Sequence, residues 1–291
     1  MPGYKIIEQL LVTTADRDRG QKKLYTDYPC RYCGQSDTNQ FKNKSHALPE
    51  SLGNNFLISG DECDECNTDF GRIEDELVKF YGNLRTILGT PNKNARPKSK
   101  LGSRRLSRND NQISLRTGHM SDVSLTRDPD GSTRLVSQLP KCKYRPYDAF
   151  LAIQKCAVSM LDRSHLPRFS SIIEIMRFRQ QIPEHLAELT LAFNSGGTNL
   201  FGAILFERDD EDILEANLRA PKNVFALLVG HTSLTFAVLD NSILENQRNR
   251  CRLTIQIQLP QVDLVYAGNQ YLNWSTNDRV ESPFNEFSVR L

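Results

Sequence analysis

The sequence contains no apolar run close to the roughly 18 residues that a membrane-spanning helix requires. Residues 1–20 lack the apolar core of a secretory signal peptide. A glycine-rich phosphate-binding loop, an internal repeat and a long low-complexity tract are also missing. These absences argue against a helical membrane protein, and we expect a cytoplasmic protein without a membrane partner.

Cysteines are few and odd in number, seven in all, which does not suit a disulfide framework. Four of them form two Cys-x2-Cys pairs, Cys30 with Cys33 and Cys63 with Cys66. Two such pairs can place four thiolates around one metal ion in a tetrahedron. The spacing therefore predicts a structural Zn²⁺ site in a reducing compartment, and the other three thiols are expected to pack as isolated side chains.

Net charge is only +2, because 37 basic and 35 acidic residues nearly cancel. The distribution is uneven, since residues 93–108 hold seven Lys or Arg and no carboxylate. We predict a basic linker at 93–110 that contacts nucleic-acid phosphates, while the alternative is a solvated flexible segment. The candidate phosphate-binding residues are Arg96, Lys98, Lys100, Arg104 and Arg105.

Periodic patterns predict an α+β fold. Between residues 67 and 88, apolar side chains recur at steps of three and four and predict an amphipathic helix. Residues 6–12 fit a helix or a strand equally well. Alternating runs predict a small antiparallel sheet over residues 112–116, 122–126 and 133–137. Further on, helices are expected from Pro146, at 171–181 and at 184–193, and strands at 200–206, 224–229, 234–239 and 253–257.

These patterns divide the chain into three parts. Residues 1–92 are expected to form a zinc-stapled module, and residues 93–110 the basic linker. Residues 111–291 would then form a C-terminal α+β domain that serves targeting, oligomerisation or regulation. In that domain, Lys155 is expected to extend its amine to solvent from an apolar helix, and Trp274 to pack in a core.

The segment between the cysteine pairs carries the chemistry. It reads as a strand, a turn at Gly53 and a second strand, which would hold His46 against the start of the following helix. Hydrolysis of a phosphodiester needs a base, a group that orients the base, and a divalent cation. Histidine suits the first task, an asparagine amide the second, and oxygen ligands suit Mg²⁺.

Residues 29–86 resemble an HNH endonuclease module, the ββα-metal finger, in its zinc-knuckle form. The matching motifs are Cys-x2-Cys-Gly at 30–34, Ser-His at 45–46 with Pro49, Gly-Asn-Asn at 53–55, and Cys-x2-Cys-Asn at 63–67 with Gly71. The resemblance implies a ββα-metal fold and a metal-dependent nuclease. It also implies that both metals, structural Zn²⁺ and catalytic Mg²⁺ or Mn²⁺, are bound.

The roles of single residues follow from the same resemblance. It makes His46 the general base and Asn55, or alternatively Asn54, the residue that steadies it. Asn67 would bind the catalytic cation. The family usually has an acidic metal ligand immediately before the histidine, and here that position is Ser45, a weaker ligand. Either Glu50, Glu74 or water completes the metal shell, or metal affinity and activity are reduced.

The first functional hypothesis is an endonuclease that hydrolyses DNA, of a kind suited to bacterial or phage defence or to a mobile element. The second is a non-catalytic zinc module that binds nucleic acid or a partner protein, with Ser45 as its sign. A third makes the C-terminal domain a sensor that switches the nuclease on. Expected partners are DNA and, through the C-terminal domain, a partner protein or a second copy of the chain.

Overall fold

The structure is a computed structural model that describes most of the chain. The described residues are 4–12, 22–26, 29–88, 98–101, 104–109, 112–116, 123–127, 129–195, 201–209, 221–230, 232–246, 265–284 and 286–290. The strand expected at 253–257 and the candidate residue Arg96 lie outside them.

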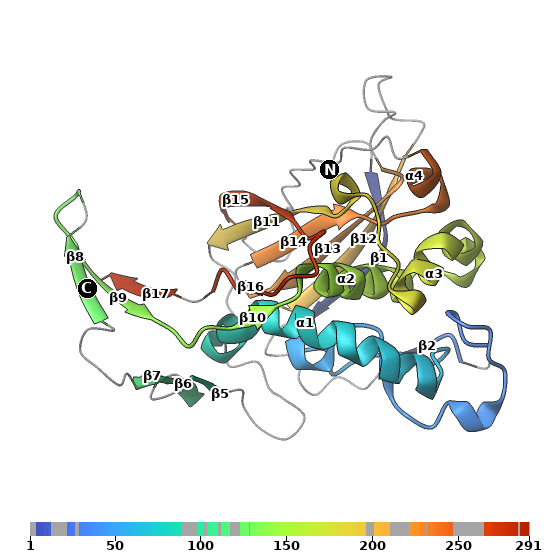
Figure 1. Ribbon diagram of the computed structural model, residues 1–291, viewed down its shortest axis with the longest axis horizontal. Coiled ribbons are helices and arrows are strands. Elements are labelled where there is room, and N and C mark those ends of the chain that lie inside the picture. The colour runs from blue at the N-terminus through green and yellow to red at the C-terminus, as the bar shows by residue number, and fades with distance from the viewer. Residues whose placement is uncertain are drawn as a thin grey trace.

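A six-stranded antiparallel sheet forms the largest layer (Figure 1). Its strands follow the order β1-β12-β13-β14-β11-β15. β13 and β14 are buried along their whole length, β13 with an apolar run from Val224 to Val229 and β14 with Thr and Ser among its apolar residues. The strands are β1 (Tyr4–Val12), β11 (Glu188–Ser195), β12 (Phe201–Arg208), β13 (Asn223–Val229), β14 (Thr232–Ala237) and β15 (Val265–Asn273).

Two features of this sheet settle or correct the sequence analysis. The ambiguous segment at 6–12 is strand β1, paired with β12. The helix expected at 184–193 is wrong, because only a 3-10 turn, Glu184–Leu186, precedes strand β11. β11 hydrogen-bonds to β14 on one side and β15 on the other, and this tertiary pairing overrides the local helical preference.

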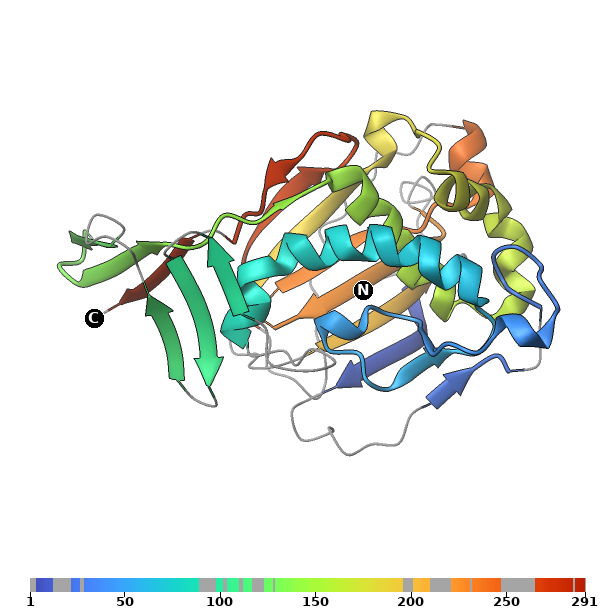
Figure 2. The same ribbon diagram turned by 60° about the horizontal axis from the view of Figure 1, so that its bottom comes forward.

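Two helices cover one face of the sheet in successive layers (Figures 1 and 2). α2 (Pro146–Met160) lies next to the sheet, and every one of its residues is buried. α1 (Asp64–Leu88) packs on α2 from the side away from the sheet. α1 covers the residues for which the apolar periodicity predicts a helix, and α2 begins at Pro146, as expected. Two shorter helices, α3 (Ser170–Phe178) and α4 (Asn241–Asn246), pack against each other at one end.

The N-terminal module consists of a small three-stranded sheet and α1. Its strands, in the order β2-β4-β3, are β2 (Lys22–Leu24), β4 (Leu57–Ser59) and β3 (Ser45–His46). β3 and β4 pair antiparallel, and the turn between them passes through Gly53 with φ +120°. A Cβ at this glycine would lie 3.3 Å from the side chain of Phe201 in β12, so the turn is packed against the large sheet.

Three smaller sheets complete the fold. One contains β5 (Lys98–Leu101), β6 (Arg104–Asn109) and β7 (Gln112–Arg116), so much of the expected linker is strand. Leu106 on β6 is fully buried, and β6 contacts α1. The others join β8 (Val123–Arg127) and β9 (Thr133–Gln138) with β17 (Glu286–Arg290), and β10 (Lys143–Tyr144) with β16 (Val280–Glu281).

One hydrophobic core runs through the N-terminal module and the C-terminal part. Phe80 of α1 makes edge-to-face ring contacts with Tyr144, Trp274 and Phe284, at centroid distances of 5.2, 4.8 and 5.4 Å. The α+β class is confirmed. The three-part division of the chain stays a prediction, and its first and third parts share this core. Among the described residues, no helix combines the length and apolar character needed to cross a bilayer.

A fragment of residues 1–110 is expected not to fold as a cooperative unit. It would expose the face of α1 that packs on α2 and would leave β1 without β12. Circular dichroism in the presence of Zn²⁺, with the full chain as control, measures this. A fragment that melts cooperatively at the temperature of the full chain would contradict the prediction.

Candidate metal centre and active site

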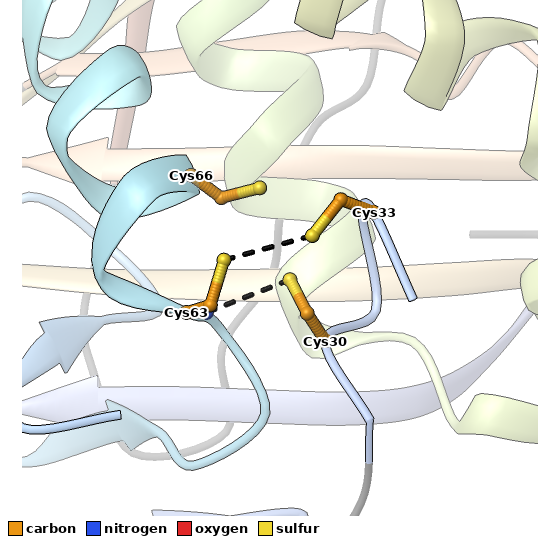
Figure 3. Close-up of side chains that lie close together, drawn as sticks. All are labelled: Cys30, Cys33, Cys63 and Cys66. Atoms are coloured by element: carbon orange, nitrogen blue, oxygen red, sulfur yellow. Dashed lines mark hydrogen bonds between the residues drawn. The ribbon is translucent and has the colours of Figure 1, made fainter. Parts of the chain in front are cut away.

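Four cysteines converge at the start of α1 (Figure 3). Their sulfur atoms all lie within 4.8 Å of one another, and the Sγ atoms of Cys33 and Cys63 are 3.6 Å apart. A tetrahedral zinc with Zn–S bonds of about 2.3 Å needs sulfur separations of about 3.8 Å. The four thiols are free rather than disulfide-bonded, and their geometry fits a structural Zn²⁺. Among the described residues, these cysteines are the only group of three or more His, Cys, Asp or Glu side chains that is close enough to hold a metal ion by itself.

The thiols also influence one another's protonation. A hydrogen bond from the Cys66 thiol is the largest influence on Cys30 and lowers its pKa to about 4, although burial opposes this. Burial raises the pKa of Cys63 to about 11, and the same shared hydrogen bond raises the pKa of Cys66. The Cys30 thiolate therefore forms readily, whereas Cys63 and Cys66 keep their protons until a cation binds, so metal uptake must release protons.

The first cysteine turn is attached to the C-terminal part by buried charges. The Arg31 guanidinium donates to Asp61 Oδ1 at 2.9 Å and to the Val158 carbonyl at 2.6 Å. Asp61 also accepts a hydrogen bond from Arg163. Next to it, the Tyr32 hydroxyl and Ser159 Oγ are 2.7 Å apart. The end of α2 thus fixes the position of the zinc site.

His46 lies on β3 with its side chain 16% exposed. Its Nε2 faces the Glu50 carboxylate at 3.7 Å, and its Nδ1 is buried without a hydrogen-bond partner among the described residues. Burial is the largest influence on the imidazole and lowers its pKa, while Glu50 and the Asn54 main chain oppose this shift. A neutral imidazole at neutral pH can accept a proton.

Asn54 fixes the loop opposite His46. Its side-chain amide donates to the carbonyls of Leu48 and Leu57, at 2.8 and 3.0 Å. Its Oδ1 accepts from the main-chain N–H groups of Phe56 and Leu57, at 3.2 and 2.9 Å. Asn54 is fully buried, whereas Asn55 is exposed. Of the two asparagines considered in the sequence, the first therefore organises the hairpin.

The two predicted cation ligands occupy different environments. Ser45 is 1% exposed, and its hydroxyl donates to the Glu62 carbonyl at 3.3 Å. Asn67 lies in the first turns of α1, half-buried, and its N–H donates to the Cys63 carbonyl. The assignment of both as catalytic metal ligands stays a prediction.

Lys155 does not extend to solvent, so the sequence-based expectation is wrong. Its amine is buried and lies 3.0 Å from Glu62 Oε2 and 2.9 Å from Glu74 Oε1. It also donates to the carbonyl of His46 at 2.8 Å. Burial lowers the pKa of this amine, but the two carboxylates outweigh burial and hold the pKa well above its ordinary value. A lysine can stay charged inside a protein when carboxylates pair with it.

The predicted basic segment presents one cationic face. Lys98 and Lys100 are two residues apart on β5, so they lie on the same face of the sheet. In the register of the strands, Lys100 lies opposite Arg105, and Arg105 lies opposite Arg116. All four side chains are exposed. Arg104 lies on β6, and its side chain is outside the described set. The sequence analysis missed Arg116, because only strand pairing brings it beside the other cations.

Comparison with known proteins gives one match. Residues 30–80 match the family model described as HNH endonuclease, which covers the four cysteines, His46 and the first part of α1. No curated protein and no solved structure matches the chain. The match confirms the resemblance and indicates a nuclease-type module, and the cysteine cluster within it is a possible structural zinc site.

Replacement of Cys30 or Cys66 by Ser is expected to remove the zinc and to destabilise the module strongly. Structural zinc typically contributes on the order of 10 kcal/mol to such sites. Zinc content and thermal unfolding measure the effect, and Cys142→Ser, outside the cluster, is the control. Zinc affinity should fall as pH is lowered, because protons compete for the thiolates. Full zinc content in Cys66→Ser would show that the ligand assignment is wrong.

Proposed function

We propose that this chain, which carries an HNH endonuclease module at residues 30–80, is a metal-dependent endonuclease that hydrolyses DNA. The observation that carries the proposal is the position of His46. It lies on the short strand β3, which pairs with β4, and the hairpin that joins these two strands is held by the fully buried Asn54. This arrangement gives the imidazole a fixed place and leaves its side chain partly open to a substrate.

In the proposed reaction, His46 removes a proton from the attacking water. Glu50 faces the imidazole and stabilises the charge that the ring gains when it takes the proton. The hydrogen bonds of Asn54 hold the loop whose main chain lies beside the ring. Asn54, rather than Asn55, is therefore our choice for the residue that steadies the base.

A divalent cation such as Mg²⁺ or Mn²⁺ would neutralise charge on the scissile phosphate and the leaving oxygen. The residues present fit such a cation in part. Asn67 would supply an amide oxygen, whereas Glu50 faces His46 and Glu74 is paired with Lys155. Ser45 is buried and does not suit the role. Mg²⁺ usually keeps several waters and needs few protein ligands, so this sparse donor set is compatible with it.

DNA is the proposed substrate because of the cationic face formed by Lys98, Lys100, Arg105 and Arg116. The opposite face of this sheet buries Leu106 against α1, so the cations must point outward. Like charges that lie directly opposite each other destabilise a sheet. A polyanion bound on this face would remove that repulsion, and phosphates of a DNA strand match the chemistry.

Purified protein is expected to nick plasmid DNA with Mg²⁺ or Mn²⁺, and His46→Ala should lower the rate by about 10² to 10⁴. His165→Ala is the matched control and should cut at the normal rate. Because the pKa of His46 is lowered, the base stays neutral to lower pH than an ordinary histidine. The acid limb of the rate profile should therefore lie below about pH 6.5.

The same experiment tests the alternative of a non-catalytic zinc module, which the burial of Ser45 favours. If the wild type and His46→Ala bind DNA equally and neither cuts it with either cation, the enzyme proposal fails. The module would then be a binding unit.

Binding through the cationic face predicts a strong salt dependence. The double variant Lys100→Gln/Arg105→Gln should make the plot of log affinity against log salt shallower by about two units of slope, since each phosphate contact contributes about −0.9. Lys5→Gln, an exposed lysine on the large sheet, is the control and should leave the slope unchanged. An unaltered slope in the double variant would show that DNA does not bind to this cationic face.

A further inference from the structure

We propose that Lys155 is a positioning residue for His46, contributed by a helix that lies outside the HNH module. The proposal rests on the function proposed above. It adds that α2, from the C-terminal part of the chain, completes the nuclease site. The family match at residues 30–80 does not include this lysine.

The contacts of the Lys155 amine join three segments of the module. It donates to the main-chain carbonyl of His46 on β3, at 2.8 Å. It forms ion pairs with Glu62, just before α1, at 3.0 Å, and with Glu74, about three turns into α1, at 2.9 Å. One hydrogen bond and two ion pairs thus meet at this ammonium group. The position of β3 relative to α1 is therefore set by one buried cation.

The strand that carries His46 has few other restraints. β3 contains two residues, and its register to β4 consists of Ser45 with Ser59 and His46 with Ile58. A charge-assisted hydrogen bond to the carbonyl of His46 is stronger and more directional than an apolar contact. It acts on the main chain of the base itself, so it controls where the imidazole is placed.

The arrangement is not explained by stability alone. Burial of the Lys155 ammonium and the Glu62 carboxylate costs solvation energy, and well-packed apolar residues often stabilise a fold as well or better. The side chain of Lys155 is 1% exposed and cannot reach a DNA phosphate. Its remaining role is to hold the site in register, which makes it a positioning residue rather than a catalytic one.

Two variants separate positioning from folding. Lys155→Met removes the ammonium with little change of shape, but it leaves the buried Glu62 and the half-buried Glu74 without their cation. Glu62→Gln/Lys155→Met also removes one of these charges and should fold more readily. The matched control is Tyr147→Phe, which removes the hydrogen bond from the Tyr147 hydroxyl to the Gln180 carbonyl near the start of α2, about two turns before Lys155 and away from His46. All are made in the full chain, with zinc content and thermal unfolding measured.

Both Lys155 variants are expected to lower kcat for plasmid nicking by about 10- to 100-fold, because small misplacements of a base have effects of this size. KM and DNA affinity should stay within about twofold of the wild type, as should kcat of the control. A Lys155 variant that is folded and zinc-loaded, yet cuts as fast as the control, overturns the proposal. A parallel loss of kcat in the control overturns it too, because the effect would then be structural.

A second measurement does not depend on activity. In protein labelled with ¹⁵N-histidine, the ring signals of His46 are assigned by their loss in His46→Ala. Glu62→Gln/Lys155→Met should shift or broaden these signals and leave the other four histidines unchanged. Unshifted His46 signals overturn the proposal. If the wild type cuts no DNA with any cation but the signals still shift, the proposed function fails and the placement of His46 by Lys155 stands.

Discussion

Helix α2 is buried along its whole length, so each polar group that it carries must find its partner inside the protein. Gln154 turns to the sheet, where its amide donates to the Ala237 carbonyl and its Oε1 accepts from the N–H of Leu239. The next residue, Lys155, turns to the N-terminal module. One helix thus fixes the distance between the large sheet and the strand that carries His46.

This constraint changes how the HNH module is understood. The cysteine cluster joins the loop of Cys30 to the start of α1, and Arg31 fastens that loop to the last turn of α2. Between these points, His46 depends on Asn54 from its own hairpin and on Lys155 from α2. The position of His46 is therefore fixed both by its own hairpin and by α2, so a displacement of α2 would displace His46.

Several features of the fold and the site could be predicted because they depend on short stretches of chain. The spacing of apolar residues located α1, and Pro146 located the start of α2. Other predictions failed where partners are distant. Residues 188–193 form a strand because two other strands flank them. Lys155 looked like a surface lysine, although a single cation on an otherwise apolar helix was a sign of a buried partner.

The choice between Asn54 and Asn55 shows the same limit at a finer scale. Adjacent residues in a turn point in different directions, and only the hairpin geometry decides which one is buried. Similarly, alternation in residues 98–116 indicated strands, but only their register gathers Arg116 with Lys100 and Arg105.

Local patterns were enough to give the α+β class and the cluster of four cysteines, because metal-ligand spacing and helical periodicity act over a few residues. Packing alone decided that Ser45 is buried, that Asn54 holds the hairpin and that Lys155 of α2 reaches the main chain of His46. The contact between Lys155 and His46 joins positions 109 residues apart, and such a contact exists only once the sheet, α2 and α1 have assembled into layers.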